Sequence, residues 1–207
     1  NETSQNNVYV LDMNLTIIGK LENIAPRETI YSGRFMGDRG YVVTFRQVDP
    51  FFAIDLQDPH SPKVLGVLKI PGYSSYLHPY DESHIIGIGK DGSVVKISLF
   101  DVSNVTDPKE IGNYTVSGSW SDSPVLSDHK ALLFNSSKNL LVMPIITSDS
   151  SVWQGAYVFN ITLQGFVLKG GVTAAGSRAA DSHTGSLAGS AQVWEAACRQ
   201  AGALTVQ

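Results

Sequence analysis

The sequence has a single cysteine and no strongly basic segment, and each absence excludes a class of protein. Cys198 alone cannot form an intramolecular disulfide or build a cysteine-based metal site. Lys and Arg together number 15 against 19 acidic residues, so the formal net charge is -4. A nucleic-acid-binding surface needs a basic patch, and we therefore expect no nucleic acid partner.

Long apolar runs are also missing from the sequence. No uninterrupted stretch of about 18 apolar residues occurs, which is the length that a membrane-spanning helix needs. The first ten residues, NETSQNNVYV, contain neither the basic nor the apolar region of a signal peptide. We expect no transmembrane segment here, and because the chain begins with Asn we expect a processed or excised piece of a longer product.

What the sequence does contain is a globular share of apolar residues, 43%, and a dense set of N-x-[ST] sequons. Such sequons accept glycans on surface loops of exported proteins, so they predict an extracellular or cell-surface location. Besides Asn1, the predicted glycosylation sites are Asn14, Asn104, Asn113, Asn135 and Asn160.

One sequence pattern recurs between residues 8 and 170. It consists of an apolar strand that ends in Asp or Asn, a polar turn, and a second strand that contains Gly. The anchoring residues Asp12, Asp55, Asp101 and Asn160 lie 43, 46 and 59 residues apart. The longest interval also holds a loop at 118–128 and an insertion at 147–151. An Asp or Asn side chain at a strand exit accepts a hydrogen bond from the backbone two residues on, which favours these turns.

Periods of 40–50 residues with several strands each are typical of β-propeller blades. The repeats therefore predict an all-β chain, a partial β-propeller of about three to four blades of antiparallel strands, with the last two strands of an earlier blade at its start. A propeller normally closes to remove sheet edges, so an incomplete one is expected to self-associate through its open edge near Val8.

The segments IYSGRFMGDRGYVVTFRQVDPFFAIDLQDPHSPKVLGVLKIPGYSSYLHPYDESHIIGIGKDG, VKISLFDVSNVTDPKE and WQGAYVFNI carry a resemblance. Over residues 8–170 the chain resembles a secreted β-propeller family of archaea and some bacteria that is distantly related to WD-type repeats. The resemblance implies a surface-attached or exported protein with no catalytic residues to transfer.

Two local motifs suggest chemistry but favour structural interpretations. Residues 87–92 read G-x-G-x-x-G, yet a strand follows where a dinucleotide site needs a helix, so we interpret the motif as a hairpin turn. His78 and His84 flank Asp81 and Glu82, but their spacing matches no recognised metal site, and a bond from the imidazole to backbone is the favoured reading.

The remaining polar and aromatic candidates are also interpreted as scaffold. The pair at 128–129, Asp then His, resembles the pairs that stitch strands in WD-type blades. The acidic residues lack the fixed spacing of a glycosidase or calcium site and are read as turn formers. The aromatic residues pack between blades or line a glycan or peptide groove, two readings that stay open. The acidic candidates are Asp49, Asp55, Asp58, Asp101, Asp107 and Asp122. The aromatic candidates are Trp120, Trp153, Tyr73, Tyr76 and Tyr80.

From Gly170 onward the strand pattern stops, and a loop rich in Ala, Gly and Ser leads to a predicted helix over 191–202 and a strand. The run KGGVTAAGSRAADSHTGSLAGSAQVWEAACRQAGALTV resembles the phosphohistidine segment of ADP-forming acyl-CoA synthetases, relatives of the succinyl-CoA synthetase α subunit. The resemblance implies a transiently phosphorylated His183, with Gly185 and Gly189 in a phosphate loop, and a cytoplasmic parent.

The sequence thus predicts a β-propeller fragment over 1–170 and an incomplete α/β tail over 171–207, joined as a chimera near 169–173. The CoA-binding and nucleotide-binding domains that such a synthetase requires do not precede the tail, so we expect no enzymatic activity, cofactor or metal. The predicted function is a noncatalytic extracellular module that binds an unknown protein or glycan or serves as a scaffold. The alternatives are an acyl-CoA synthetase fragment acting through His183 and a glycan-binding propeller.

Overall fold

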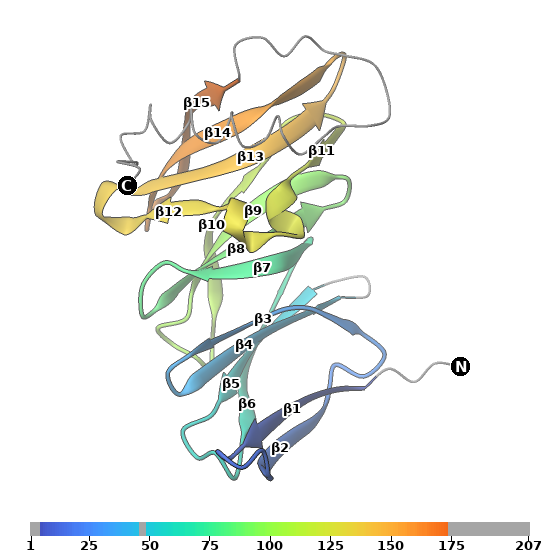
Figure 1. Cartoon of the computed structure of the whole chain (residues 1–207), viewed down its shortest axis with the longest axis vertical. Helices are drawn as coiled ribbons and strands as arrows, with labels where there is room; N and C mark the ends of the chain where they lie inside the picture. The colour runs from blue at the N-terminus through green and yellow to red at the C-terminus, as the bar shows by residue number, and fades with distance from the viewer. Residues whose placement is uncertain (1–4, 46–48, 174–207) are drawn as a thin grey trace. The chain divides into compact units, whose positions relative to one another are not determined.

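The computed structural model describes residues 5–45 and 49–173, and these residues form strands and three short 3-10 helices (Figure 1). No α-helix occurs within the described ranges, and none of their helices is long and apolar enough to cross a membrane. The strands are arranged in four antiparallel sheets. The prediction of an all-β chain is therefore confirmed.

The first two sheets come from the N-terminal third of the chain. A two-stranded sheet pairs β1 (Asn6–Leu11) with β2 (Ile17–Ile24). The second sheet runs in the order β3 (Thr29–Met36), β4 (Arg39–Phe45), β5 (Asp49–Asp55) and β6 (Lys63–Ile70). The two-stranded sheet matches the predicted last two strands of an earlier repeat.

The third and fourth sheets follow the same sequential order. The third contains β7 (Tyr73–Pro79), β8 (His84–Asp91), β9 (Val94–Asp101) and β10 (Lys109–Thr115). The fourth contains β13 (Leu140–Ser148), β14 (Val152–Thr162) and β15 (Gly165–Val172), with β11 (Trp120–Asp122) and β12 (Leu133–Asn135) both paired to β13. Strands that follow each other in sequence are thus neighbours in the third sheet and from β12 to β15 in the fourth, as hairpin turns require, whereas β11 pairs with β13 and not with β12.

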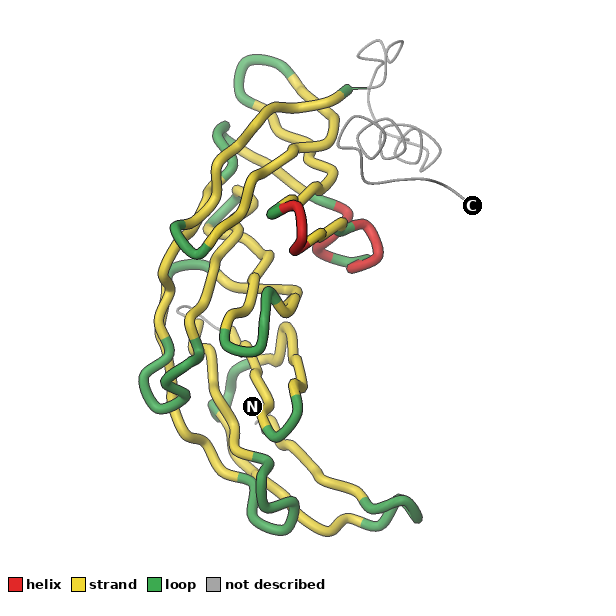
Figure 2. The backbone as a smooth tube through the Cα atoms, turned by 90° about the vertical axis from the view of Figure 1, so that its left-hand side faces the viewer, coloured by secondary structure: helices red, strands yellow, loops and turns green. Residues whose placement is uncertain are grey.

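The segment that leads into the fourth sheet differs from the expectation. The segment 118–128, expected to be a loop, contributes β11 and the 3-10 helix η1 (Pro124–Leu126), and Thr147 and Ser148 belong to β13 rather than to an insertion. Two further 3-10 helices, η2 (His129–Ala131) and η3 (Ser136–Lys138), flank β12; Figure 2 shows all three in red. The side chains of Ser123, Asp128 and Asn135 cap these helices at their first turns. The helices separate β11 from β12 and β12 from β13.

The chain divides into two compact units. The first contains Asn1–Asp91 and Lys96–Ile111, and the second contains Gly92–Val95 and Gly112–Gln207, each within the described ranges. The first unit therefore holds the first two sheets and most of the third, and the second unit holds the fourth sheet. The two units are described separately below.

Strand position within a sheet follows the hydrophobic pattern. In the interior strands β8 and β9, consecutive residues are buried, which matches the continuous apolar runs in IIGIG and VVKISLF. In the terminal strand β10, burial alternates with every residue, as a strand with one covered face requires. The two kinds of run in the sequence thus distinguish interior strands from outer ones.

The cores of the first unit lie between successive sheets. One cluster joins the second and third sheets and includes Phe51, Ile85 and Phe100, with the rings of Phe51 and Phe100 stacked at 4.7 Å. A second cluster joins the first and second sheets through Val8, Ile24 and Val42 among others. In the second unit, Val142 and Ala156 form the centre of a separate cluster. Packing between sheets, not within one layer, holds the first unit together.

Of the tail predicted over 171–207, residues 174–207 lie outside the described residues, and the predicted helix and second strand lie there. β15 itself ends at Val172, two residues beyond the predicted boundary at 170. The fold described above is therefore that of the repeat region.

Candidate functional site

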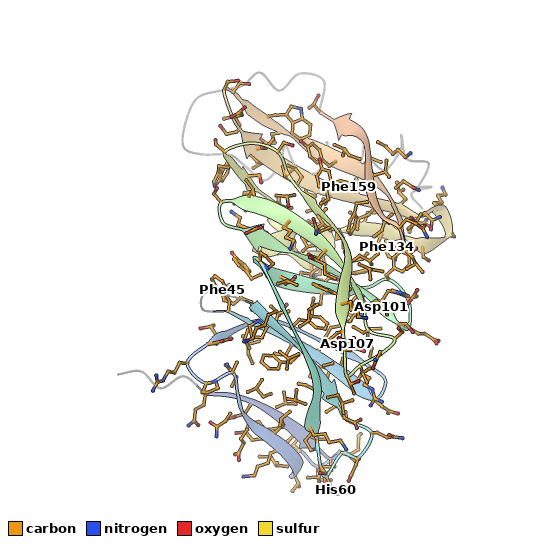
Figure 3. The ribbon with its side chains drawn as sticks, turned by 180° about the vertical axis from the view of Figure 1, so that it is seen from behind. Phe45, His60, Asp101, Asp107, Phe134 and Phe159 are labelled. Carbon is orange, nitrogen blue, oxygen red and sulfur yellow. The ribbon has the colours of Figure 1, made fainter. Side chains whose placement is uncertain are left out.

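The carboxylates of Asp12, Asp58 and Asp101 accept hydrogen bonds within their own turns. Asp12 Oδ1 accepts from the backbone N–H groups of Asn14 and Thr16, both at 2.8 Å. Asp58 Oδ1 accepts from the backbone of His60 at 3.0 Å, and Asp101 Oδ1 accepts from that of Ser103 at 2.9 Å. Figure 3 shows His60, Asp101 and Asp107 at the connections between outer strands. Their interpretation as turn formers is thereby confirmed for these three carboxylates.

Asp55 and Asp101 take part in charge interactions. Asp55 pairs with Arg39, the residue opposite it in the β4–β5 register, and with Lys63 at 3.9 Å. Hydrogen bonds from Ser103 lower the pKa of Asp101, and the nearby His84 and Lys109 lower it further. The Asp101 side chain is thus stabilised as an anion at a strand exit, which is a structural task.

The glycine motif at 87–92 lies on a hairpin. Gly87 and Gly89 belong to β8, and Gly92 has φ of +59° at the turn into β9. A side chain at Gly89 would overlap the carbonyl oxygen of Tyr73, and one at Gly87 would meet the ring of Phe100. The interpretation as a hairpin is confirmed, and the two strand glycines serve close packing rather than phosphate binding.

The two histidines of the segment 78–84 have different partners. His84 Nδ1 lies 2.8 Å from Asp81 Oδ1, and its Nε2 lies 4.0 Å from Asp101 Oδ1. His78 Nδ1 lies 2.8 Å from the hydroxyl of Tyr76. The imidazole of His84 is thus bonded to a carboxylate where a backbone partner was expected, and that of His78 is bonded to a hydroxyl. No group of three potential metal ligands occurs among the described residues.

The pair at 128–129 also has a different role from the expected one. Asp128 accepts from the backbone N–H of Lys130 at 3.0 Å and thereby caps η2. Asp128 is thus the N-cap of a 3-10 helix. The sequence pattern of an Asp before a short turn was the correct local signal.

An aromatic cluster forms where β3 lies beside β7, and the sequence analysis recognised only one of its members. The ring of Tyr31 lies 4.6 Å from that of Tyr73 and 5.6 Å from that of Phe45, and the Phe45 and Tyr73 rings are 5.1 Å apart. Tyr31 is 42% exposed. Because Tyr31 and Tyr73 are 42 residues apart in sequence, no local pattern predicts this cluster.

The same strand pair carries a polar group further along. Ser32 Oγ donates to the carbonyl oxygen of Ser74 at 2.6 Å, which fixes β3 against β7. Burial lowers the pKa of His78, and the positive charge of Arg34 lowers it further. Burial raises the pKa of the Tyr76 hydroxyl, although Arg34 opposes that change. Arg34 on β3 thus acts electrostatically on both Tyr76 and His78 of β7, the two strands that also carry Tyr31 and Tyr73.

Comparison with known proteins identifies the repeat. The sequence matches the family model for the beta propeller domain over residues 1–200. The chain belongs to the β-propeller domain family. The match covers nearly the whole chain, and the four sheets are its blades or parts of blades.

The propeller has relatives in archaea. An uncharacterized protein of Archaeoglobus fulgidus is 45% identical over 156 residues, and one of Methanocaldococcus jannaschii is 44% identical over 157 residues. Each alignment covers 75% of this chain and 24% of the relative. The chain therefore spans about a quarter of the length of these relatives, and their names state no activity.

The predicted phosphohistidine segment of the propeller chain receives no support from these comparisons. His183, Gly185 and Gly189 lie outside the described residues, and the propeller family match extends through them to residue 200. The coarser resemblance, to archaeal β-propellers, is confirmed.

The predicted glycosylation sites differ in exposure. Asn14, Asn104 and Asn113 are exposed, whereas Asn135 and Asn160 are half-buried. Asn160 Nδ2, the atom to which a glycan would be attached, donates to the carbonyl oxygen of Asn139 at 3.2 Å. The structure therefore presents the first three asparagines more openly than the last two.

Proposed function

We propose that this propeller segment is a noncatalytic extracellular or cell-surface module that serves as a scaffold or binding platform. The observation that supports the proposal is the use of its strand-end carboxylates: Asp12, Asp58 and Asp101 each accept hydrogen bonds from their own turns. Groups that a hydrolytic or phosphoryl-transfer site would need are thus engaged in building turns. Binding therefore depends on surface shape and charge.

The competing proposal is the acyl-CoA synthetase fragment, and one labelling experiment separates the two. The full chain is incubated with acetyl phosphate or with labelled ATP and magnesium. The scaffold proposal predicts no acid-labile label. Acid-labile label that disappears in His183→Ala would overturn it in favour of a phosphohistidine.

The extracellular location rests on the sequons. Because Asn14, Asn104 and Asn113 are exposed, we expect glycans on them, and lower occupancy on Asn160, whose amide nitrogen is engaged. Peptide mass spectrometry of protein recovered from its native organism measures the occupancy. Unmodified asparagine at all five sites would contradict this part of the proposal.

A second candidate function, glycan binding, is favoured by the aromatic cluster of Tyr31, Phe45 and Tyr73. Aromatic faces pack against the apolar faces of sugar rings, and Tyr31, which contacts Tyr73, is 42% exposed. The test is a glycan array with the full chain, Tyr31→Ala, and Tyr9→Ala as the matched control, since Tyr9 is 47% exposed on β1. Absence of binding, or equal loss in both variants, would remove this candidate.

A further inference from the structure

A glycine recurs at one structural position in the outer strands of the blades. Gly19 in β2 pairs with Val10, which lies two residues before the anchor Asp12, and Gly66 in β6 pairs with Ala53, two residues before Asp55. In both cases the strand register shifts beside this pair. The strand pairing allows this comparison in three of the four sheets.

Gly170 occupies the same position in the last blade. It lies in β15 opposite Val158, two residues before the anchor Asn160, and the register again shifts beside the pair. In the third blade, Gly112 lies 11 residues after Asp101, the same spacing as that between Asp55 and Gly66. These four glycines are called the receptor glycines: Gly19, Gly66, Gly112 and Gly170.

The first three receptor glycines are covered by the outer turn of the following blade. A side chain at Gly19 would overlap the carbonyl oxygen of Pro59, and His60 Nδ1 lies 3.1 Å from the carbonyl oxygen of Ile18 beside it. A side chain at Gly66 would overlap the carbonyl oxygen of Val105. The backbone of each turn thus lies where any other residue would place its Cβ, which explains the glycine.

The third contact is looser but of the same kind. A Cβ at Gly112 would lie 3.0 Å from the Cα of Gly165, the residue at the start of β15. Every receptor glycine that has a following blade in the described chain therefore contacts that blade's outer connection. A Cβ at Gly66 would also lie 2.9 Å from Pro108.

Gly170 differs from the other three, because its position is open. Within the described residues no atom lies within 4 Å of the place where its Cβ would be. Its strand also exposes Val167 at 54%. The last blade thus presents the same receiving position without the turn that covers it elsewhere.

An outer turn without a receptor glycine lies at the other end of the repeat. The β1–β2 connection is the first outer turn in the chain, so no described blade precedes it. It exposes apolar side chains that a solvent-facing turn does not need: Met13 is 98% exposed, Leu15 is 78% exposed and Ile17 is 56% exposed. Pro59 and Val105 are the residues of the later turns that approach receptor glycines.

We propose that the Gly170 edge of β15 binds the β1–β2 turn of a second copy of this chain, so that copies associate head to tail. The contact continues the junction seen at Gly19, Gly66 and Gly112, and it covers the exposed apolar turn of one copy with the open strand of the other. Such a heterologous contact produces a ring or an open chain of copies rather than a symmetric dimer. The inference rests on the proposed scaffold role and applies to chains whose Asn14 carries no glycan, because a sugar there would stand on the same turn.

Sedimentation velocity of the full chain, prepared without glycan because a sugar on Asn14 would stand on the same turn, tests the proposal. We expect the average sedimentation coefficient to rise between about 1 and 100 μM by mass action. Gly170→Val and Leu15→Asp are each expected to weaken association at least about tenfold. Phe35→Gln, a control that replaces a side chain 60% exposed in the β3–β4 hairpin, is expected to leave it unchanged.

Mixing the two interface variants gives the decisive result. Gly170→Val keeps an intact β1–β2 turn and Leu15→Asp keeps an intact Gly170 edge, so the mixture is expected to form a 1:1 dimer that does not grow further. Leu15→Asp is an independent test, because Gly170→Val also strains β15. The proposal is overturned by a monomeric wild-type chain, as when a further blade or residues 174–207 take the position, or by association that ignores both substitutions. Neither outcome bears on label at His183, so failure here is distinct from failure of the noncatalytic proposal.

Discussion

Gly66 and Gly170 occupy the same place in two blades, yet one is enclosed and the other is open. Around Gly66, the outer turn of the next blade brings Val105 and Pro108 so close that no other residue fits. Around Gly170, nothing in the described chain approaches. The difference indicates that the glycine is part of a junction between blades, because a requirement of the strand alone would not bring a turn to it.

The strongest way to break the enclosed junction is to remove the core beneath it. Phe100 is fully buried and stacks on Phe51 between the second and third sheets. Phe100→Ala is expected to lower the free energy of unfolding by about 3–5 kcal/mol. Urea denaturation measures the change, with Phe35→Ala as the exposed control. Equal effects in the two variants would contradict the assigned core.

A matched pair of charge substitutions compares the two turns themselves. Val105 packs against the core cluster, whereas Leu15 is 78% exposed on the first turn. Val105→Asp is expected to cost about 2–3 kcal/mol because it buries a carboxylate, and Leu15→Asp is expected to cost almost nothing in a monomer. Thermal unfolding at low protein concentration measures both. A large loss for Leu15→Asp alone would reverse the comparison.

The sequence predicts the turns at the strand ends well, but it does not predict the contacts between successive blades. Asp12, Asp58 and Asp101 act on backbone two to four residues away, so their roles follow from local patterns. The glycine of each second strand was visible too, but its reason was not, because Val105 reaches Gly66 from 39 residues away in the chain.

The candidate binding surface shows the same limit. Tyr31 meets Tyr73, and Ser32 meets Ser74, only because successive blades bring β3 beside β7. Arg34 was absent from the sequence-based candidates because an isolated Arg in an alternating strand carries no motif. By contrast, the two 3-10 helices between β11 and β12 follow from local capping by Ser123 and Asp128, which the sequence contains.

A smaller effect sharpens the picture of the inner strands. Because burial lowers the pKa of His78, the unfolded chain binds a proton more readily than the folded one. Its contribution to stability is therefore complete above the ordinary histidine pKa of about 6.5 and declines as the pH falls below it. His78→Asn is expected to flatten the loss of stability between about pH 6.5 and 5. An identical pH profile in the variant would contradict this assignment.

The smallest effect concerns the open turn. Leu15 has φ of +62°, a left-handed conformation that asparagine adopts more readily than leucine. Leu15→Asn is expected to raise the free energy of unfolding by about 0.5 kcal/mol in the monomer. Thermal melts of dilute protein detect the gain, and a clear loss would show that the leucine side chain supports the turn.

Alanine substitution of all four receptor glycines tests the junction between blades most directly. We predict that Gly66→Ala, which forces a backbone turn to move, costs about 3 kcal/mol and lowers Tm by about 6–12 °C, with Gly19→Ala similar. Gly112→Ala is expected to cost less, and Gly170→Ala only the roughly 1 kcal/mol of backbone strain from its φ of +157°. Equal losses of Tm in all four variants would contradict the account, because the glycines would then serve their strands and not the contact between blades.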